Sequence, residues 1–488
     1  MAEQDIDARF TRGSTMRHVA VMTATASVGL MSLFLVDAAN LFYISLLGQT
    51  ELAAAIGFAG TIQFFMISIS IGLAIAATAT VSRAVGAGDR SGARRLAASA
   101  LTVLVSVLTI AAALVWSYRD AALSLLGASG DAHAIASDFL AIVLPSLPLL
   151  GIAMVASGLL RSVGDAKRAM YVTLSGGVFG ALLDPVFIFD WGFGLGVEGA
   201  AYVSVLGRVL VAAVGLFYAI GRHDLIGRIN LRGTLGDTRT LLAIAGPAVA
   251  TQLSTPFGNA YLTSTVAEYG DQAVAGWAVV GRITALAFGG IFALSGAVGP
   301  ILGQNYGAGL YPRLRMAYRD ALIFAACYVT VVWFILFLLT DPLIAAFGLD
   351  GPGAEVLTAF THFGAGSFLF TAALFVSNAA FNNLGKPTWS TGFNWSRDAL
   401  AVPLLVLVLS GLMGAAGVVA IQALASLAIG GLAAATAWRF VATIDPAPRD
   451  LTPFPSSTPS NPLSSGRSAQ VTFAEQDQDP LAKREERG

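Results

Sequence analysis

Residues 302–309 read Leu-Gly-Gln-Asn-Tyr-Gly-Ala-Gly, and residues 81–88, which lie 221 positions earlier, read Val-Ser-Arg-Ala-Val-Gly-Ala-Gly. The same spacing aligns Leu-Arg-Ser-Val-Gly at residues 160–164 with Phe-Asn-Asn-Leu-Gly at residues 381–385. Two matches at one spacing indicate an internal repeat. The chain therefore consists of two related halves that follow one another in the same direction.

The composition is that of an integral membrane protein. Hydrophobic residues make up 56% of the 488 residues and charged residues only 12%, whereas soluble domains are about 25% charged. The formal net charge is −1, so we do not expect a nucleic-acid partner. Cys327 is the single cysteine, so the chain cannot form an intramolecular disulfide, and a metal site built from several cysteines is excluded. We therefore expect the lipid bilayer to surround most of the chain.

Runs of about 20 apolar residues predict twelve transmembrane helices, six in each half. We place them at residues 19–47, 53–81, 96–117, 134–160, 169–190, 197–220, 241–266, 273–302, 320–340, 355–384, 390–410 and 417–440. Six spans in each half make the repeats parallel, related by a pseudo-two-fold axis along the membrane normal. The predicted fold class is all-α integral membrane, with a central cavity between the halves. A duplicated unit of this kind is the architecture of transporters that work by alternating access.

The loops predict the sides of the membrane and the domain organisation. Lys and Arg gather in alternate loops, while the other side has only Arg119. Because positive loops face the cytoplasm, both termini are expected there. The expected parts are a cytoplasmic segment over residues 1–18, an N-terminal six-helix lobe over 19–220, a cytoplasmic linker over 221–240 and a C-terminal six-helix lobe over 241–440. Residues 441–488 are rich in Pro, Ser and charge, which predicts a disordered cytoplasmic tail.

Two carboxylates fall in the outer halves of helices that run in the same direction. Asp37 lies in the first span and Asp184 in the fifth. An ionised Asp near the bilayer centre costs about 2.5–3.5 kcal/mol, so its default interpretation is an ion, proton or substrate site, and the alternative is a hydrogen bond to a neighbouring helix. If the two carboxylates converge, one proton can switch them. Pro185 removes a backbone donor and favours a kink beside Asp184.

Polar and flexible side chains in other spans are candidates for a substrate cavity. They are Gln63, Met66, Gln252, Asn259, Asn378, Asn394 and Asp398. Asn394 and Asp398 share one helix face at i, i+4 and could bind a cationic substrate, although Asp398 could equally neutralise Arg397 or a nearby helix end. No His/Glu cluster or Ser/His/Asp set occurs in the spans, so the sequence favours neither a metal site nor a membrane enzyme.

Several motifs together resemble the multidrug and toxic compound extrusion (MATE) family. Residues 303–309, Gly-Gln-Asn-Tyr-Gly-Ala-Gly, are similar to the family's loop after helix eight. Residues 160–167, Leu-Arg-Ser-Val-Gly-Asp-Ala-Lys, resemble its motif after helix four, and residues 184–189, Asp-Pro-Val-Phe-Ile-Phe, its motif in helix five. Two shorter matches are Asn-Leu-Gly-Lys-Pro at 383–387 and Gly-Pro at 246–247. The similarity spans residues 19–440.

The resemblance implies an antiporter for multidrug efflux, which is not an enzyme and needs no cofactor beyond its coupling ion. Its substrates would be small amphipathic, cationic drugs or toxins, exchanged for protons or sodium ions. It assigns ion coupling to Asp37 and Asp184, as in the branch of the family that couples ions through its N-terminal half. We expect a monomer in the inner membrane of a prokaryotic cell.

One departure from the family bears on the coupling ion. Relatives commonly carry Asn four residues before the helix-five Asp, whereas this chain has Gly180. The missing oxygen ligand weakens a sodium site at Asp37 and Asp184, although Asn40 or Tyr202 could compensate. The sequence therefore favours protons, with a sodium-coupled exporter of the same fold as the alternative.

A second alternative is a lipid-linked oligosaccharide flippase of the same superfamily. Such a protein needs several basic residues around a pyrophosphate. The intramembrane bases Arg208, Arg282 and Arg397 are too few and too scattered to favour it.

Overall fold

The computed structural model describes residues 8–45 and 50–444, which form helices and no strand. The backbone of helix α1 is described to its end, but some of its side chains are not, including those of Asp37 and Asn40. The predicted tail begins within helix α17, which ends at Thr443, and its residues from 445 onward lie outside the described part of the chain.

The helices of the N-terminal half are η1 (Arg9–Thr11), α1 (Thr15–Ser45), α2 (Thr50–Gly86), α3 (Arg90–Ser117), α4 (Arg119–Leu125), α5 (Gly130–Val143), η2 (Leu144–Ser146), α6 (Leu147–Ser162), α7 (Ala166–Ile188), α8 (Gly196–Leu216) and η3 (Phe217–Arg222). Helix α1 packs against α7, while α6 lies against α2 and α8. Alanine, leucine and valine side chains from α2, α5 and α8 fill the interior of this lobe.

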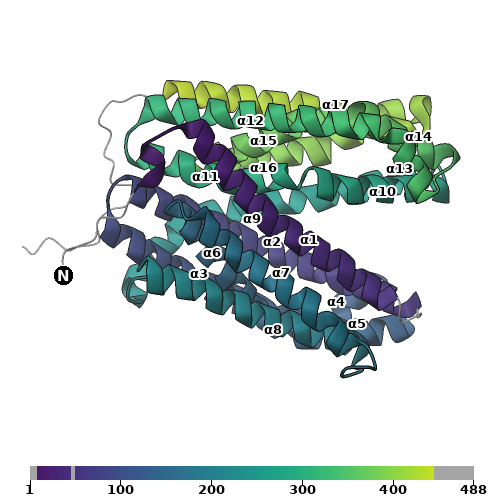
Figure 1. The fold of residues 1–488 in the computed structure, drawn as a ribbon, viewed down its shortest axis with the longest axis horizontal. Coiled ribbons are helices and arrows are strands. Elements are labelled where there is room, and N and C mark those ends of the chain that lie inside the picture. The colour runs from purple at the N-terminus through teal and green to yellow at the C-terminus, as the bar shows by residue number, and fades with distance from the viewer. Residues whose placement is uncertain (1–7, 46–49, 445–488) are drawn as a thin grey trace, which may run out of the picture. The chain divides into compact units, whose positions relative to one another are not determined.

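The helices of the C-terminal half are α9 (Leu231–Ala267), α10 (Asp271–Ala287), α11 (Gly289–Gly307), α12 (Tyr311–Leu338), α13 (Thr340–Phe347), α14 (Gly351–Ala359), η4 (Phe360–Gly364), α15 (Ala365–Asn383), α16 (Pro387–Trp395), η5 (Ser396–Ala401) and α17 (Val402–Thr443). Helix α15 is central here, because α11, α12, α16 and α17 all pack against it. Figure 1 shows the helices of the two halves as separate bundles, with α1 crossing from one toward the other.

Within the described residues, each of the twelve predicted spans falls mainly on helix, and the all-α membrane fold is confirmed. In the described part of the chain, ten helices are long and apolar enough to cross a membrane, or eleven if α10 and α11, bent by 44°, form one span. The predicted span at residues 241–266 is not among them. It forms part of α9, whose mean hydropathy is lowered by threonine, glycine and the two interior prolines, Pro247 and Pro256.

The span predicted over 134–160 lies within one apolar helical stretch long enough to cross a membrane, Gly130–Ser162. This stretch is interrupted between α5, η2 and α6, because Pro145 cannot donate a backbone hydrogen bond. Trp116 Nε1 instead donates to the carbonyl oxygen of Ala141, four residues before this proline, at 3.2 Å. Helix α9 begins at Leu231, ten residues before the predicted span and within the expected linker, because Asn230 caps it. Its first turns are polar, so hydropathy does not detect them.

The internal repeat recurs in the backbone. Glycines with positive φ angles come in pairs 221 residues apart, namely Gly88 with Gly309, Gly127 with Gly348, Gly130 with Gly351, and Gly164 with Gly385. The repeat also governs how the lobes meet. A Cβ atom on Gly86 would lie 2.6 Å from Cα of Gln304, and one on Gly307 would lie 3.0 Å from Cα of Arg83. Gly86 and Gly307 are 221 residues apart, and so are Arg83 and Gln304, so each contact is the repeat equivalent of the other, as a pseudo-two-fold axis requires.

Candidate functional site

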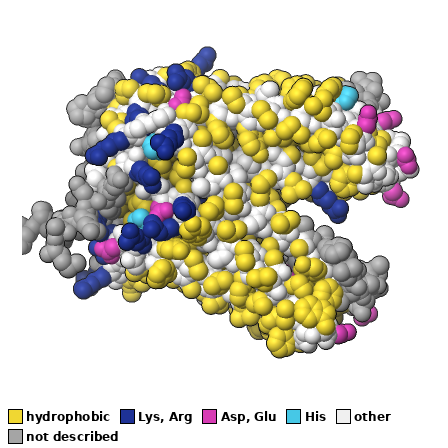
Figure 2. Space-filling model, in the orientation of Figure 1, with side chains coloured by type: hydrophobic (Ala, Val, Ile, Leu, Met, Phe, Trp, Pro, Cys, Tyr) yellow, Lys and Arg dark blue, Asp and Glu magenta, His cyan; other side chains and the backbone are white. Residues whose placement is uncertain are grey.

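The lobes are closed against each other at one end, where α2, α6 and α11 end. We call this the arginine-rich end, because Lys and Arg side chains gather there (Figure 2). Beyond the glycine contacts, Gln304 Nε2 donates to the carbonyl oxygen of Ser162 at 2.6 Å, which joins α11 to α6. Figure 2 shows the surface hollowed between the two bundles at the opposite end. The space between the lobes is therefore sealed on one side.

The N-terminal segment strengthens this seal. Phe10 is buried, and its backbone N–H donates to Gln304 Oε1 at 2.8 Å. Its carbonyl oxygen accepts from Arg313 Nε at 3.0 Å, in the C-terminal lobe. Next to it, Arg9 donates to the carbonyl oxygen of Gly164 in the N-terminal lobe, at 3.3 Å. One short stretch of chain thus holds both lobes together.

A cavity of about 400 Å³ lies between the lobes. It is lined by α1, α2, α6 and α7 of one lobe and by α11 and α15 of the other, with single residues from α8 and α9. Most of its lining is aliphatic or methionine, which suits an adaptable apolar site. Its polar members are Thr25, Thr78, Ser157, Arg161, Thr173, Gln252, Ser295, Asn382 and Asn383. Arg161 is the one ionisable side chain among these described lining residues.

Arg161 lies in the last turn of α6 and is held by few partners. Its Nη1 donates to Ser157 Oγ at 2.9 Å, and its Nε is buried without a hydrogen-bond partner. No carboxylate within the described residues forms an ion pair with it. The nearest acid in the sequence, Asp165, is bound by Arg168 and by His223 Nε2, the latter at 2.7 Å. Burial raises the pKa of Asp165, but these hydrogen bonds outweigh it and lower the pKa to about 2.

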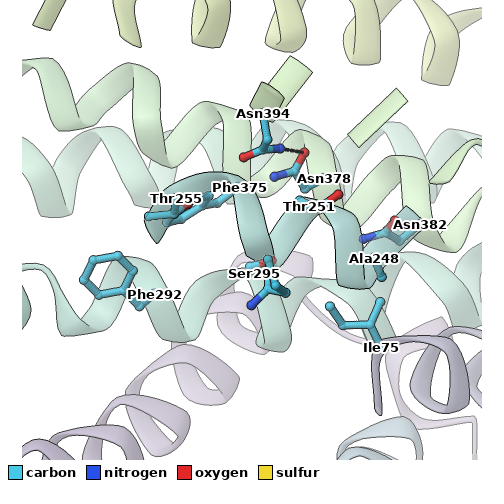
Figure 3. Close-up of a pocket in the computed structure, with 11 residues that line it drawn as sticks. Ile75, Ala248, Thr251, Thr255, Phe292, Ser295, Phe375, Asn378, Asn382 and Asn394 are labelled. Atoms are coloured by element: carbon cyan, nitrogen blue, oxygen red, sulfur yellow. Dashed lines mark hydrogen bonds between the residues drawn. The ribbon is translucent and has the colours of Figure 1, made fainter. Parts of the chain in front are cut away.

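A smaller polar pocket of about 80 Å³ adjoins the cavity on the side of the C-terminal lobe (Figure 3). The two share five lining residues, namely Ile75, Gln252, Phe292, Ser295 and Asn382. Asn394 Nδ2 donates to Asn378 Oδ1 at 3.0 Å and to the carbonyl oxygen of Ser390 at 2.7 Å. Amide groups from α9, α15 and α16 therefore converge beside two phenylalanine rings, those of Phe292 and Phe375. The pocket offers hydrogen bonds without a charge.

The structure places three of the seven predicted cavity residues on this lining, namely Gln252, Asn378 and Asn394. The other four lie elsewhere. Met66 is buried in the interior of the N-terminal lobe, and Asn259 is exposed and outside both linings. Asp398 is buried and pairs with Arg397, with Nε and Oδ1 2.8 Å apart.

Gln63 is held by the buried Arg208. Its Oε1 accepts from Arg208 Nη2 at 2.8 Å, while Nη1 donates to the carbonyl oxygen of Val143 and to Ser146 Oγ. Arg208 thereby bonds to the broken stretch between α5 and α6. Gln63 and Arg208 thus stabilise the interior of the N-terminal lobe.

Of the two predicted coupling residues, Asp184 lies on the face of α7 that packs against α1. Asp184 is 3% exposed and lies one residue before the interior Pro185 of α7. A Cβ atom on Gly180 would lie 3.6 Å from Asp184 Oδ2 and 3.0 Å from Val36 Cγ1 of α1. Asp184 therefore lies on the α7 face that meets α1 around Val36. The side chains of Asp37 and Asn40 lie outside the described residues.

Neither Asp184 nor Tyr202 lines the cavity, and Tyr202 is 41% exposed. No group of three or more His, Cys, Asp or Glu side chains in the described part of the chain could hold a metal ion.

Sequence reasoning missed Arg161, although a signal for it existed. Adding 221 to its number gives Asn382, and both residues line the cavity from opposite lobes. The repeated motif at 160–164 and 381–385 therefore brings both lobes to the cavity at equivalent positions.

The chain matches the protein-family model MatE over residues 25–186 and 247–407, one stretch in each half. It is 28% identical over 338 residues to a FAD transporter of Shewanella oneidensis, covering 68% of this chain and 74% of that protein. It is 22% identical over 385 residues to the multidrug export protein MepA of Staphylococcus aureus, covering 78% and 84%.

Solved structures share the fold. A mutant of the MATE transporter VcmN from Vibrio cholerae superimposes with a TM-score of 0.82 at 23% identity, over 87% of this chain and 96% of that one. A MOP superfamily transporter from Pyrococcus furiosus has a TM-score of 0.82 at 21% identity, over 89% and 98%.

Proposed function

We propose that this chain, which belongs to the MatE family of multidrug and toxic compound extrusion transporters, exports small amphipathic organic compounds in exchange for protons. Membership of the family makes it a multi-pass membrane transporter and not an enzyme. The observation that carries the proposal is the cavity of about 400 Å³ between two related lobes, sealed at one end. Its size suits a drug-sized ligand.

Alternating access needs a cavity that opens to one side of the membrane at a time. The seal lies at the arginine-rich end, which by the distribution of positive charge faces the cytoplasm. We propose that the structure is the outward-open state of an inner-membrane exporter with both termini inside. Return to the inward-open state requires the contacts of Gly86, Gly307 and Gln304 to separate.

Coupling is assigned to Asp184, with Asp37 as its expected partner on α1. Asp184 is buried on the α7 face that packs against α1, where the gain or loss of one proton changes the charge between two packed helices. Gly180 supplies no oxygen beside it, which favours protons over sodium ions. Because α1 also packs against α11 and α12 of the other lobe, a change at Asp184 that moves α1 also affects the contact between the lobes.

The substrate charge is a separate question. The resemblance favours a cationic substrate, but the one ionisable side chain among the described lining residues is itself a cation. A second candidate substrate is therefore a flavin nucleotide, favoured by the relative named a FAD transporter. Inhibition of export by added FAD, with none by riboflavin, would support this second candidate.

The test is export from proteoliposomes of the neutral dye 7-diethylaminocoumarin-3-carboxamide. We expect an imposed proton gradient to drive its transport and a sodium gradient of equal size to be without effect. Asp37→Asn and Asp184→Asn should each abolish the proton-driven component, whereas Asp131→Asn, at an exposed position in the first turn of α5, should leave it intact. Sodium-driven transport, or full activity of both variants, would contradict the proposal.

A further inference from the structure

We infer that the cavity between the lobes binds an anionic group of its substrate at Arg161, so that amphiphiles carrying a carboxylate, sulfonate or phosphate are preferred over neutral and cationic ones. The inference rests on the proposed function and narrows its substrate class. It concerns the binding site only and is independent of the coupling ion.

The first step is the charge of the site. Arg161 is the one ionisable side chain among the described residues that line the cavity or its adjoining polar pocket. A cationic ligand would meet no counter-charge on this lining and would be repelled by the guanidinium. An anionic ligand would pair with it, and guanidinium groups bind carboxylates and phosphates in a two-point geometry.

The second step is that the described residues do not satisfy the guanidinium. Arginine carries five N–H donors, and among these residues Arg161 makes one side-chain hydrogen bond, from Nη1 to Ser157 Oγ. Its Nε is buried without a partner. Leaving a buried, charged donor unpaired is costly. The two buried arginines, Arg208 and Arg397, show what a satisfied group looks like, because Arg208 makes three hydrogen bonds and Arg397 pairs with Asp398.

The third step is that the nearest acid in the sequence does not compete for the site. Asp165, four residues further along the chain, binds Arg168 and His223 and is thus already neutralised. Asn382 and Asn383 line the cavity from the other lobe and supply neutral amides, so the positive charge of Arg161 is unopposed. An anion from the ligand is the missing partner.

The fourth step concerns the rest of the ligand. The same cavity is lined by Phe292 and by apolar side chains such as Leu30 and Met154, and it meets the polar pocket at Gln252. An apolar or aromatic body fits against these side chains, with a neutral hydrogen-bonding group toward the amides. The structure therefore assigns an anionic head at α6 and a planar or apolar body toward α9 and α11.

Three dyes with one chromophore separate the effect of charge from that of shape. They are 7-diethylaminocoumarin-3-carboxylate, its neutral primary amide, and the amide bearing a trimethylammonioethyl group. Binding to the purified full-length protein is measured by fluorescence anisotropy. We expect the wild type to bind the carboxylate more tightly than the ammonium dye.

Arg161→Gln should weaken carboxylate binding by about tenfold or more and change amide binding by less than about twofold. Arg161→Lys should retain part of the preference for the carboxylate dye, since lysine keeps the positive charge but cannot form the two parallel hydrogen bonds of a guanidinium group. Arg239→Gln, at an exposed position on α9, is the matched control and should bind all three dyes as the wild type does.

Two outcomes would overturn the inference. One is a wild type that binds the ammonium dye at least as tightly as the carboxylate, which requires no variant to fold. The other is an equal loss of all three dyes in Arg161→Gln, as expected for a packing role alone. Export of the neutral amide under a proton gradient reports on the proposed function separately, so either conclusion can fail while the other stands.

Discussion

Replacing Gly307 by alanine should force the two lobes apart at the arginine-rich end. The added Cβ atom would lie 2.9 Å from the carbonyl carbon of Arg83 and closer still to its oxygen. Carbon atoms in contact prefer about 3.5–4.0 Å, so the backbones of α2 and α11 must separate by roughly 1 Å. Neither partner is a flexible side chain, so the strain cannot be relieved by a rotamer change.

Overpacking of this kind costs about 1–3 kcal/mol. Only the state sealed at the arginine-rich end bears this cost, so its population relative to the open state should fall by about 5- to 150-fold. The separation of the lobes can be measured by double electron–electron resonance between spin labels at Ser91→Cys and Leu310→Cys, both at exposed positions near that end. The native cysteine is removed by Cys327→Ala so that only these two positions are labelled. We expect Gly307→Ala to shift the distance distribution toward longer separations.

The matched control is Gly281→Ala in α10, where a Cβ atom meets nothing within 4 Å. It carries the same change in helix propensity and should leave the distances unchanged. If Gly307→Ala gave the distribution of the wild type, the close approach of α2 and α11 would not be what seals the cavity.

Three further predictions follow from contacts in the same structure. Phe10→Ala should lengthen the same label distances, because the buried ring and its backbone bonds hold both lobes. Asp398→Ala should lower the free energy of unfolding by about 3–5 kcal/mol, seen as a lower thermal unfolding midpoint, because Arg397 is left buried and unpaired. Replacing both Arg397 and Asp398 by leucine should recover part of the lost stability. For Asp165, the folded pKa of about 2 lies below the unfolded value, so its contribution to stability is present above about pH 4 and is lost as pH falls toward 2. The unfolding midpoint of Asp165→Asn should therefore lie below that of the wild type at pH 7 and approach it on acidification.

Hydropathy and the 221-residue repeat were sufficient to predict the helical fold and its two halves, because both reflect physical requirements of spanning a bilayer. Some local details were not predicted. Pro145 interrupts the helix of the fourth span without ending the span, and Asn230 begins α9 in a polar stretch that resembles a linker. Gly414, with a φ angle of 60°, is what divides α17 between the last two predicted spans.

The candidate site was predicted in part. Amide side chains within apolar spans can be recognised in the sequence, and two of them, Asn378 and Asn394, form a hydrogen bond beside the cavity. Asp398 illustrates why polarity alone does not identify a cavity residue, since a buried charge first needs a partner and its neighbour Arg397 provides one. Arg161 was overlooked because a basic residue at a span boundary is expected in a loop, whereas α6 continues to Ser162 and keeps it within the lobe contact.

The most direct test of proton exchange is the release of protons when a substrate binds. Purified wild-type protein in weakly buffered detergent solution would be mixed with the neutral coumarin amide, and the pH followed with an indicator dye. We predict that binding releases protons, that Asp184→Asn abolishes the release while still binding the dye, and that Asp131→Asn behaves as the wild type does. Binding without any release by the wild type, or an undiminished release by Asp184→Asn, would contradict coupling at this carboxylate.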